Sequence, residues 1–141
     1  MAKVGPIMII EDDKDDREIL QEIIESLGIK NELRFFGSGQ DALDYLMTTS
    51  DQPFIILSDV NLPKMTGIEL RQRINESEYL RQKSIPFIFL TTTATPIAVK
   101  QAYDMMVQGF FQKELNYAQV KYMVKLIFDY WSVCKHPNNT W

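Results

Sequence analysis

The sequence predicts an α/β fold: a doubly wound sheet of five parallel strands with five helices on its two faces. Three observations support this prediction. Strand-like apolar runs alternate with segments of helical periodicity five times along the chain. Three of these runs are continuously apolar, which is typical of parallel strands that are covered on both faces. No linker, repeat or low-complexity tract divides the 141 residues, so we expect one domain over residues 1–135 and a short tail over residues 136–141.

The first part of the chain contributes two strands and two helices to this prediction. The first strand, Ile7–Ile10, precedes a helix over Asp15–Leu27, and Gly28 is expected to cap the end of that helix. The apolar residues of the helix share one face: Ile19, Leu20, Ile23, Ile24 and Leu27. A second strand over Glu32–Phe36 and a second helix over Gln40–Thr48 follow.

The middle of the chain repeats the pattern twice. A third strand over Phe54–Ser58 precedes a helix over Gly67–Arg81. A fourth strand over Phe87–Leu90 precedes a helix over Pro96–Val107. The proline that begins this last helix suits the first turn, and Thr95 is available as its N-cap.

The last strand, Gly109–Gln112, precedes a long final helix over Tyr117–Cys134. Apolar residues at helical spacing predict its buried face: Val120, Met123, Val124, Ile127 and Trp131. Four further aromatic residues exceed what one buried face requires: Tyr117, Tyr122, Phe128 and Tyr130. Beyond the helix, His136 is the only histidine, and we expect it to be exposed in the tail.

The composition is that of an ordinary globular protein, with 45% hydrophobic and 24% charged residues. Fifteen basic and nineteen acidic residues give a net charge of -4 without any lysine/arginine run, which argues against a nucleic-acid surface. The longest apolar stretches are shorter than the roughly 18 residues of a membrane span, and no secretory signal is evident. One cysteine, Cys134, excludes an internal disulfide, so we expect a cytoplasmic protein.

Carboxylates follow two of the predicted strands. Asp59 follows the third strand, and Glu11 and Asp12 follow the first. In an open parallel sheet, ligands bind beyond the carboxyl ends of the strands, so these side chains converge if the two strands are neighbours. Two carboxylates about 4 Å apart repel by roughly 4 kcal/mol at an effective dielectric constant of 20, so the cluster requires a cation. Oxygen ligands in a partly open site suit Mg²⁺, to which Asn61 could add its backbone carbonyl.

Two more polar groups are expected at the same edge of the sheet. The fourth strand leads into a run of threonines that begins at Thr91, and the fifth strand ends at Lys113. A carboxylate nucleophile, a metal ion, a hydroxyl and a lysine together describe a site for phosphoryl transfer. Each of these residues alone is a weak signal, but their joint occurrence at one predicted edge is a strong one.

Four motifs of the sequence resemble those of the receiver domain of two-component response regulators, and the resemblance extends over nearly the whole chain. "IIEDD" resembles the acidic residues after the first strand of that family, and "SDVNLPKMTG" resembles its phosphoacceptor loop. "FLTT" is similar to the strand that ends in the switch threonine, and "GFFQK" to the strand that ends in the phosphate-binding lysine. The resemblance implies a flavodoxin-like sheet with the strand order 2-1-3-4-5.

The resemblance also implies a role for the side chains at the sheet edge. Glu11, Asp12 and Asp59 would bind Mg²⁺, and Asp59 would accept the phosphoryl group. Lys113 would bind the phosphoryl oxygens. Asp13 falls just after the acidic pair and is expected to be an accessory residue or to start the helix.

Other positions would control switching and the lifetime of the phosphoryl group. Thr91 and Phe110 match the switch threonine and the switch aromatic residue of the family. Asn61 and Thr92 are expected to tune how readily water reaches the phosphoryl-aspartate. Glu114 departs from the family, which usually has a proline in a cis peptide after the lysine, so the conformation of the peptide before it stays open.

The implied function is that of a single-domain response regulator in a phosphorelay. It would accept a phosphoryl group from a sensor histidine kinase or a histidine phosphotransfer protein, and its only catalysis would be its own phosphorylation and dephosphorylation. The long last helix is similar to that of the small regulators that partner bacterial phytochrome-type histidine kinases. A homodimer through Pro96–Val107, Gly109–Gln112 and Tyr117–Cys134 would provide a face on which the switch is read.

Three other functions are alternatives. A Mg²⁺-dependent phosphatase with an aspartyl nucleophile requires an Asp-x-Asp pair after the first strand and a cap domain, whereas this chain has Glu11, Asp12 and Asp13 there. A flavodoxin-like electron carrier requires a Ser/Thr/Gly-rich phosphate loop where this chain is acidic. The remaining alternative is a receiver-like module that only binds proteins and is never phosphorylated, although such modules usually lose the acceptor or the acidic pair.

Overall fold

Five parallel strands form one sheet in the order β2-β1-β3-β4-β5, as the sequence and its resemblance predicted. The structure is a computed structural model, and it describes residues 2–113 and 116–138. The strands are β1 (Ile7–Ile10), β2 (Leu33–Phe36), β3 (Ile55–Ser58), β4 (Phe87–Thr91) and β5 (Gly109–Gln112). Each predicted strand is present, with bounds that differ by no more than one residue. In the central pair, Ile10 of β1 lies opposite Ser58 of β3.

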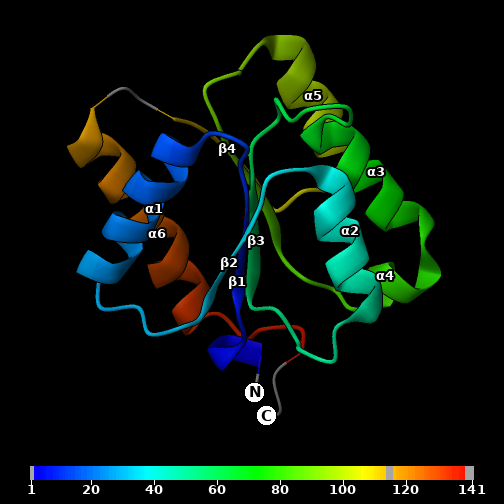
Figure 1. Ribbon diagram of the computed structural model, residues 1–141, viewed down its shortest axis with the longest axis horizontal. Coiled ribbons are helices and arrows are strands. Elements are labelled where there is room, and N and C mark those ends of the chain that lie inside the picture. Colours follow the sequence, from blue (N-terminus) through cyan, green and yellow to red (C-terminus); the bar gives the residue numbers. More distant parts are fainter. Residues whose placement is uncertain (1, 114–115, 139–141) are drawn as a thin grey trace.

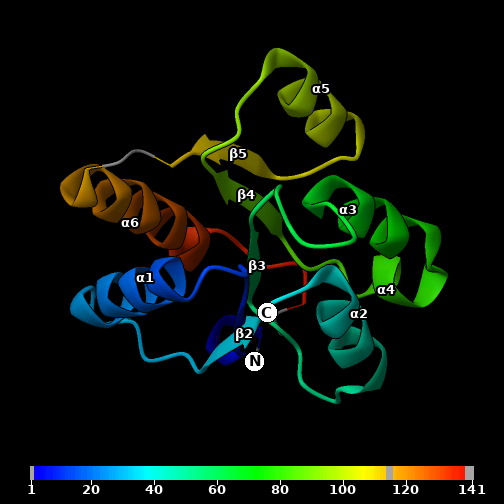
Figure 2. The ribbon, with the colours of Figure 1, turned by 45° about the horizontal axis from the view of Figure 1, so that its top comes forward.

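Helices cover both faces of this sheet (Figures 1 and 2). They are η1 (Ala2–Val4), α1 (Lys14–Ser26), α2 (Gly39–Thr48), α3 (Gly67–Glu76), α4 (Glu78–Gln82), α5 (Pro96–Asp104) and α6 (Tyr117–Val133). Helices α1 and α6 lie on one face, and α2, α3, α4 and α5 lie on the other (Figure 2). Two apolar clusters result, one on each face of the sheet. The side chains of β1 alternate between them, so that Ile9 packs toward α1 and α6 and Met8 toward α2 and α3.

Helix termini carry the polar caps that these ends require. Asp13 caps α1 by accepting a hydrogen bond from the backbone nitrogen of Asp16 at 3.0 Å, which makes it the helix-start residue that the sequence suggested. Thr95 caps α5 in the same way, and proline occupies the first turn, as predicted. Gly28 follows α1 with φ of 75°, the left-handed conformation in which glycine commonly ends a helix.

The single helix expected over Gly67–Arg81 is wrong, because the chain forms two helices there and six α-helices among the described residues. The break is at Ser77, which ends α3 and begins α4. Its backbone is extended, with φ of -91° and ψ of 114°, and its hydroxyl accepts a hydrogen bond from the backbone nitrogen of Leu80 at 3.2 Å. A serine that caps a new helix therefore replaces the continuous helical ladder at this point.

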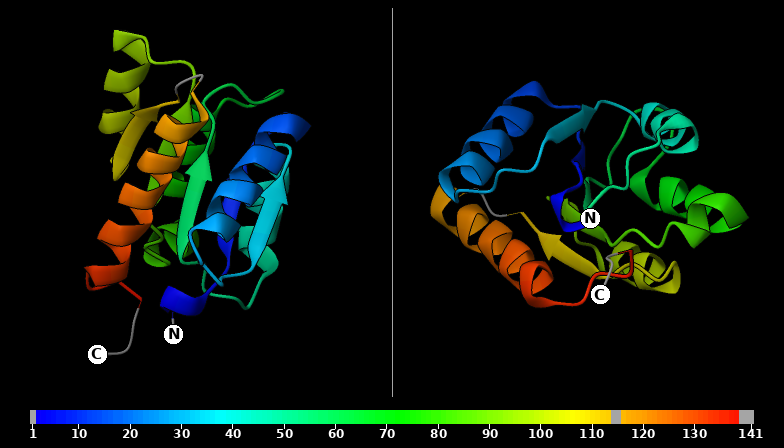
Figure 3. Two further views of the ribbon diagram at one scale, coloured as in Figure 1. Left: turned by 90° about the vertical axis from the view of Figure 1, so that its left-hand side faces the viewer. Right: turned by 90° about the horizontal axis from the view of Figure 1, so that it is seen from below.

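Two expectations for the C-terminal region are also wrong. Phe128 was counted among the surplus aromatic residues of the last helix, but it is buried against Phe54 with ring centroids 6.2 Å apart. His136 was expected to be exposed, but its side chain is fully buried at the end of the sheet where the strands begin. Figure 3 shows the red segment after α6 passing across the end of the sheet at which the strands begin. Among the described helices, none has the combined length and apolar character that a membrane crossing demands.

Candidate functional site

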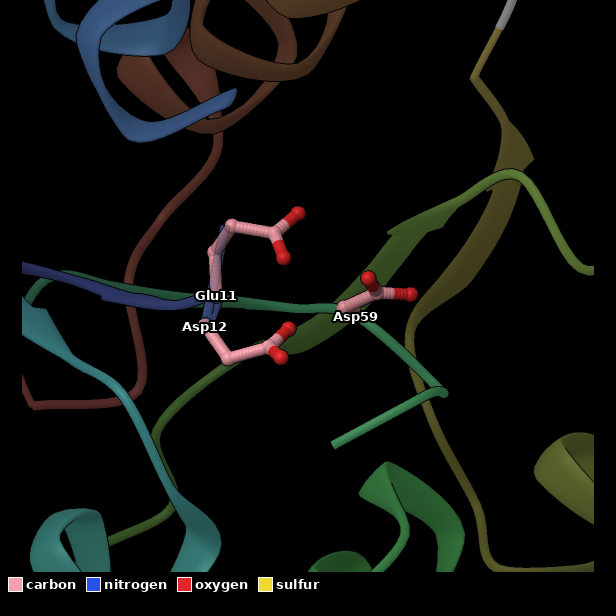
Figure 4. Close-up of side chains that lie close together, drawn as sticks. All are labelled: Glu11, Asp12 and Asp59. Carbon is pink, nitrogen blue, oxygen red and sulfur yellow. The ribbon is translucent and has the colours of Figure 1, made fainter. Parts of the chain in front are cut away.

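The carboxylates of Glu11, Asp12 and Asp59 meet beyond the ends of β1 and β3. One oxygen from each of the three groups can be chosen so that all lie within 4.8 Å of one another. Figure 4 shows Glu11 and Asp12 at the end of β1 with Asp59 beside them at the end of β3. The positions follow from the sheet, because the backbone nitrogen of Asp59 donates a 3.0 Å hydrogen bond to the carbonyl of Ile10. Neighbouring strands of a parallel sheet thus bring together side chains that are far apart in the sequence.

This cluster fits a small divalent cation. Its ligand atoms are carboxylate oxygens, which Mg²⁺ and Mn²⁺ prefer over nitrogen and sulfur. Glu11 is buried and Asp12 is exposed, so the site is anchored in the protein on one side and open to water on the other. Mg²⁺ commonly keeps several waters in such a partly open site. The backbone carbonyl of Asn61 as a further ligand stays a prediction.

Asp59 is held in place by two hydrogen bonds, one from the end of β4 and one from its own loop. The hydroxyl of Thr91, at the end of β4, donates to its Oδ1 over 2.5 Å, and the backbone nitrogen of Asn61 donates to the same oxygen over 3.2 Å. Both bonds from described residues reach Oδ1, so Oδ2 is the oxygen that is left for a metal or a reaction. Thr91 has no exposed surface, and its position is therefore fixed by the core of the sheet.

Lys113 supplies the positive charge at this end of the sheet. Its ammonium lies 3.0 Å from Oε1 of Glu11 and 3.5 Å from Oδ2 of Asp16, and only 10% of its side chain is exposed. The backbone nitrogen of Lys113 donates a 2.6 Å hydrogen bond to the carbonyl of Thr91, which ties β5 to β4. The cation is thus held beside the acidic cluster by its own strand and by two carboxylates.

Burial and charge perturb the pKa values of the Glu11–Lys113 pair. Burial and, to a smaller extent, the charge of Asp59 together raise the pKa of Glu11 to about 7, against the opposing effect of the Lys113 charge. Burial alone would lower the pKa of Lys113, but the charges of Glu11, Asp16 and Asp59 outweigh it and raise that pKa. Glu11 therefore holds a proton more readily than an ordinary glutamate, and a bound cation would favour its ionised form.

The loop that carries Asp59 is shaped by Gly67 at the start of α3. A Cβ atom at this position would lie 2.2 Å from the carbonyl oxygen of Asp59 and 2.7 Å from the ring of Phe89. The backbone nitrogen of Gly67 donates a 2.7 Å hydrogen bond to the carbonyl of Val60. Helix α3 can therefore begin this close to the acceptor only because its first residue has no side chain. A reciprocal capping box between Thr66 and Glu69 fixes the same helix start.

The two residues expected to tune access to Asp59 are both exposed, and they differ in their contacts. The side-chain amide of Asn61 donates to the hydroxyl of Thr93 and so joins the loop after β3 to the loop after β4. The backbone nitrogen of Thr93 in turn donates to the hydroxyl of Thr91 at 3.2 Å. Thr92 is exposed between them. Roles for Asn61 and Thr92 in the lifetime of a phosphoryl group remain predictions, and the peptide before Glu114 lies outside the described residues.

Phe110 of β5, the expected switch aromatic residue, is half-buried at the edge of the core. Its ring packs against that of Phe89 with centroids 5.6 Å apart. The next side chain of β5, Phe111, packs toward the opposite face of the sheet. The ring of Phe110 therefore lies at the edge of the apolar cluster and is only partly buried.

Two contacts of the site were not predicted from the sequence, although Thr93 belongs to the run of threonines that was expected at this edge. Asp16 reaches Lys113 from the first turn of α1, and Thr93 receives the side chain of Asn61. The sequence did contain a signal for Asp16, because a helix that starts directly after the acidic cluster places its first acidic residues at the same edge. Thr93 had no comparable signal, since which threonine of a run faces a loop depends on the path of that loop.

Comparison with known proteins agrees with this architecture. The sequence model of the response regulator receiver domain matches residues 7–125. Response regulator Rcp1 of Synechocystis is 32% identical over 130 residues, which span 89% of this chain and 87% of Rcp1.

Two solved structures extend the likeness to three dimensions. The phosphorylated cyanobacterial phytochrome response regulator RcpA has a TM-score of 0.86 and 28% identity, over 95% of this chain and 99% of RcpA. The Mn²⁺-bound form of Rcp1 has a TM-score of 0.84 and 29% identity, over 94% of this chain and 99% of Rcp1. The family match covers most of the chain and its strand-end site, and we conclude that this protein belongs to the response regulator receiver domains of two-component signalling.

Proposed function

We propose that this protein is a single-domain response regulator that accepts a phosphoryl group on Asp59 in a Mg²⁺-dependent reaction. The donor is the phosphohistidine of a sensor histidine kinase or of a histidine phosphotransfer protein. One observation carries the proposal: three carboxylates, a buried threonine hydroxyl and a nearly buried lysine converge at one end of the sheet. A Mg²⁺-dependent phosphatase with an aspartyl nucleophile shares this chemistry, but it requires an Asp-x-Asp pair where this chain has Glu11, Asp12 and Asp13.

The reaction is a displacement at phosphorus. An oxygen of the Asp59 carboxylate attacks the phosphorus atom, a P–O bond forms, and the P–N bond breaks with its electron pair going to the imidazole of the donor. Glu11, Asp12 and Asp59 would hold Mg²⁺, which when bound offsets the negative charge of the phosphoryl oxygens. Lys113 lies beside the same edge, where its ammonium can exchange a carboxylate partner for a phosphoryl oxygen.

Signalling would follow a shift between two conformations. The hydroxyl of Thr91, which donates to Asp59 before the reaction, would turn toward a phosphoryl oxygen afterwards. Phe110 would then move into the space that Thr91 leaves, because it lies on the neighbouring strand and is only half-buried. Such a change biases an equilibrium between packed states and does not require a new fold.

The test is phosphorylation with a small phosphodonor. Wild-type protein incubated with acetyl phosphate and Mg²⁺ should gain one phosphoryl group by intact mass, and the gain should disappear when EDTA replaces Mg²⁺. Asp59→Asn should remove it, whereas Asp41→Asn, an exposed aspartate of α2, should leave it unchanged. Equal labelling of wild type and Asp59→Asn would exclude Asp59 as the acceptor. A folded wild type that is never labelled would favour the alternative of a receiver-like protein-binding module.

We also propose that the output face is formed by α5, β5 and α6, through which two copies associate. Exposed apolar side chains gather there: Tyr103, Tyr122, Leu126, Tyr130 and Val133 are each at least 44% exposed. All of them except Tyr122 line a groove of about 730 Å³ along β5, which is an edge strand of the sheet. Contiguous exposed apolar surface of this kind marks an interaction site more often than not.

Sedimentation velocity at micromolar concentration tests this face, with and without a phosphoryl mimic. Wild type should dimerise, more strongly with the mimic, and Tyr130→Glu should remain monomeric. Met47→Glu, at an exposed apolar position on α2, is the matched control and should behave like wild type. Phe128 cannot serve in this test because it is buried. A wild type that stays monomeric in both states would leave a different protein as the reader of this face.

The most specific part of the proposal is the class of histidine kinase that donates the phosphoryl group. RcpA, a cyanobacterial phytochrome response regulator, matches this chain over 95% of its length, which supports a phytochrome-type histidine kinase as the donor. A phosphotransfer profile against purified kinases tests it: the cognate kinase should label Asp59 faster than any other. Preferential transfer from a kinase without a photosensory region would overturn the assignment while leaving Asp59 as the acceptor.

A further inference from the structure

The C-terminal segment Lys135–Asn138 is docked on the amino end of the sheet through the imidazole of His136. This ring has no exposed surface, although it lies beyond the last helix. Its Nε2 lies 2.8 Å from the carbonyl oxygen of Phe54, and its Nδ1 lies 3.1 Å from the backbone nitrogen of Asn138. The ring also faces the rings of Phe54 and Trp131, at centroid distances of 5.6 and 6.3 Å.

These two hydrogen bonds determine the protonation state of the ring. The backbone N–H of Asn138 can only donate, so Nδ1 must accept and carries no proton. The carbonyl of Phe54 can only accept, so Nε2 must carry the single proton and donate. The docked segment is therefore compatible with one form of His136 only, the neutral Nε2–H tautomer. A second proton would place an N–H at Nδ1 opposite the N–H of Asn138.

The same segment makes further contacts at this end of the molecule. The side-chain amide of Asn138 donates to the carbonyl of Lys83 and, at 3.3 Å, to that of Ser84, in the connection between α4 and β4. Pro137 and Trp131 form part of the wall of a cavity of about 540 Å³ at this end of the sheet. Trp131 also lines the groove along β5. The docked segment thus packs against Trp131, a side chain that also belongs to the α5–β5–α6 face.

We propose that Lys135–Asn138 is a proton-operated latch, docked while His136 is neutral and released when its ring binds a second proton. The proton comes from solvent and binds at Nδ1, which turns an accepting atom into a donor. Release exposes the cavity wall and frees Trp131 at the end of α6. The proposal does not rest on phosphorylation of Asp59, because the latch and the acidic cluster lie at opposite ends of the sheet (Figures 1 and 4).

The charges around the ring act in the direction that the latch requires. Burial lowers the pKa of His136 below 6.5, and the cation of Lys3 in η1 lowers it further, against the opposite effect of the Phe54 carbonyl. Lys135 adds a second cation next to the ring in the chain. The ammonium of Lys83, from the segment that receives Asn138, lies 4.9 Å from the ring centre of Tyr79. Among the described residues, no carboxylate forms an ion pair with His136.

The sign of the pH dependence follows from the lowered pKa. The unfolded or undocked chain binds the second proton near pH 6.5, whereas the docked ring binds it only at lower pH. The docking contribution is therefore complete above pH 6.5 and is lost as the pH falls below that value. A latch of this kind would respond to a fall in the pH of the solvent. It would do so at the amino end of the sheet, whereas the phosphorylation chemistry takes place at the carboxyl end.

Two measurements on the whole chain test the latch. His136 is the only histidine, so ¹⁵N NMR of its ring can be read without assignment. It should show the Nε2–H tautomer at pH 7.5 and a pKa below 6.5. The second measurement is tryptophan emission in a Trp141→Phe background, which leaves Trp131 as the single tryptophan. Its emission should shift to longer wavelength with the same midpoint as the ring titration.

The matched control is His136→Gln, whose amide can still donate to the carbonyl of Phe54 but does not titrate. The emission wavelength of Trp131 in this variant should not change across the same pH range, whatever its value. Glu11 titrates in both proteins, so a shift that it caused would appear in both. Three results would overturn the proposal: the Nδ1–H tautomer at pH 7.5, a ring pKa at or above 6.5, or an emission shift that persists in His136→Gln. The NMR result on wild type is decisive even if the variant folds poorly.

Discussion

The two ends of the sheet treat polar side chains in opposite ways. At the carboxyl end, Glu11, Asp12 and Asp59 place like charges within 4.8 Å of one another, with Lys113 as their nearly buried counter-charge. At the amino end, the buried side chain of the docked tail is the neutral imidazole of His136, which has backbone partners at both ring nitrogens. The carboxyl end therefore contains a repulsion between carboxylates that a bound cation can relieve. The amino end is covered by the tail, whose buried polar groups already have partners.

This difference separates function from stability within one small domain. Clustered carboxylates lower the stability of the metal-free protein, and such perturbed groups are common where a site must bind or react. Fully partnered neutral groups add stability and require no ligand. The two ends should therefore respond in opposite directions to pH, and unequally to Mg²⁺.

The largest expected effect is the pH dependence of stability in metal-free protein. The pKa of Glu11 is raised from 4.5 to about 7, so folding retains a proton and the free energy of unfolding should fall by up to about 3 kcal/mol as the pH rises from 4.5 to 7. The lowered pKa of His136 has the opposite sign, and its contribution should be lost as the pH falls below 6.5. Urea unfolding with EDTA at a series of pH values measures both. Glu11→Gln should remove the fall in unfolding free energy between pH 4.5 and 7, and His136→Gln should remove the loss of stability below pH 6.5. A fall between pH 4.5 and 7 that survives Glu11→Gln would contradict the raised pKa of Glu11.

A second prediction concerns the close packing of α3 against Asp59 at the carboxyl end of the sheet. Gly67→Ala should lower the free energy of unfolding by about 2 kcal/mol and slow phosphorylation, because its Cβ would meet the carbonyl of Asp59 at 2.2 Å. Gly37→Ala is the control, since a Cβ there meets no atom within 4 Å, and its effect should be within about 0.5 kcal/mol. Urea unfolding of both variants gives the comparison. Equal effects would mean that the approach of α3 to Asp59 is not tight.

A third prediction concerns the counter-charge. Lys113→Ala should cost about 1 to 2 kcal/mol at pH 8 and less at pH 6, where Glu11 can bind a proton instead. Its effect on switching should be larger, because the phosphoryl group would lose its cationic partner. Lys100→Ala, which removes an exposed ion pair with Asp104 on α5, should change stability by no more than about 0.5 kcal/mol. An unfolded Lys113→Ala protein would show that the lysine is chiefly structural.

The smallest effect is expected for Asp12→Asn. Asp12 is exposed, so removing its charge should raise the stability of the metal-free protein by only about 0.5 kcal/mol. The same change should weaken Mg²⁺ binding, seen as a smaller rise in melting temperature on adding Mg²⁺ than in wild type. A clear fall in the metal-free melting temperature would identify Asp12 as a structural residue.

Much of the fold was predictable because its signals are local. Continuous apolar runs identified the buried strands, and the rule that ligands bind beyond parallel strand ends identified Glu11, Asp59, Thr91 and Lys113. The break at Ser77 was not predicted, because it depends on the competition between a new helix cap and a continuous helical ladder.

Long-range docking explains the remaining errors. The burial of His136 depends on Phe54, which lies 82 residues earlier in the chain, and on a turn that brings Asn138 back to the ring. Phe128 is buried by the same residue, Phe54. Neither contact leaves a pattern within its own segment, so no reading of the tail alone could have found them.

The most direct test of the central claim is the chemical identity of the phosphorylated residue. An acyl phosphate on aspartate is reduced by borohydride to homoserine, so protein treated with acetyl phosphate and Mg²⁺ can be reduced, digested and sequenced by mass spectrometry. We expect homoserine at residue 59 and nowhere else, dependent on Mg²⁺. Homoserine at Asp12 or Asp13, or none at all in protein that binds Mg²⁺, would contradict the account of this end of the sheet.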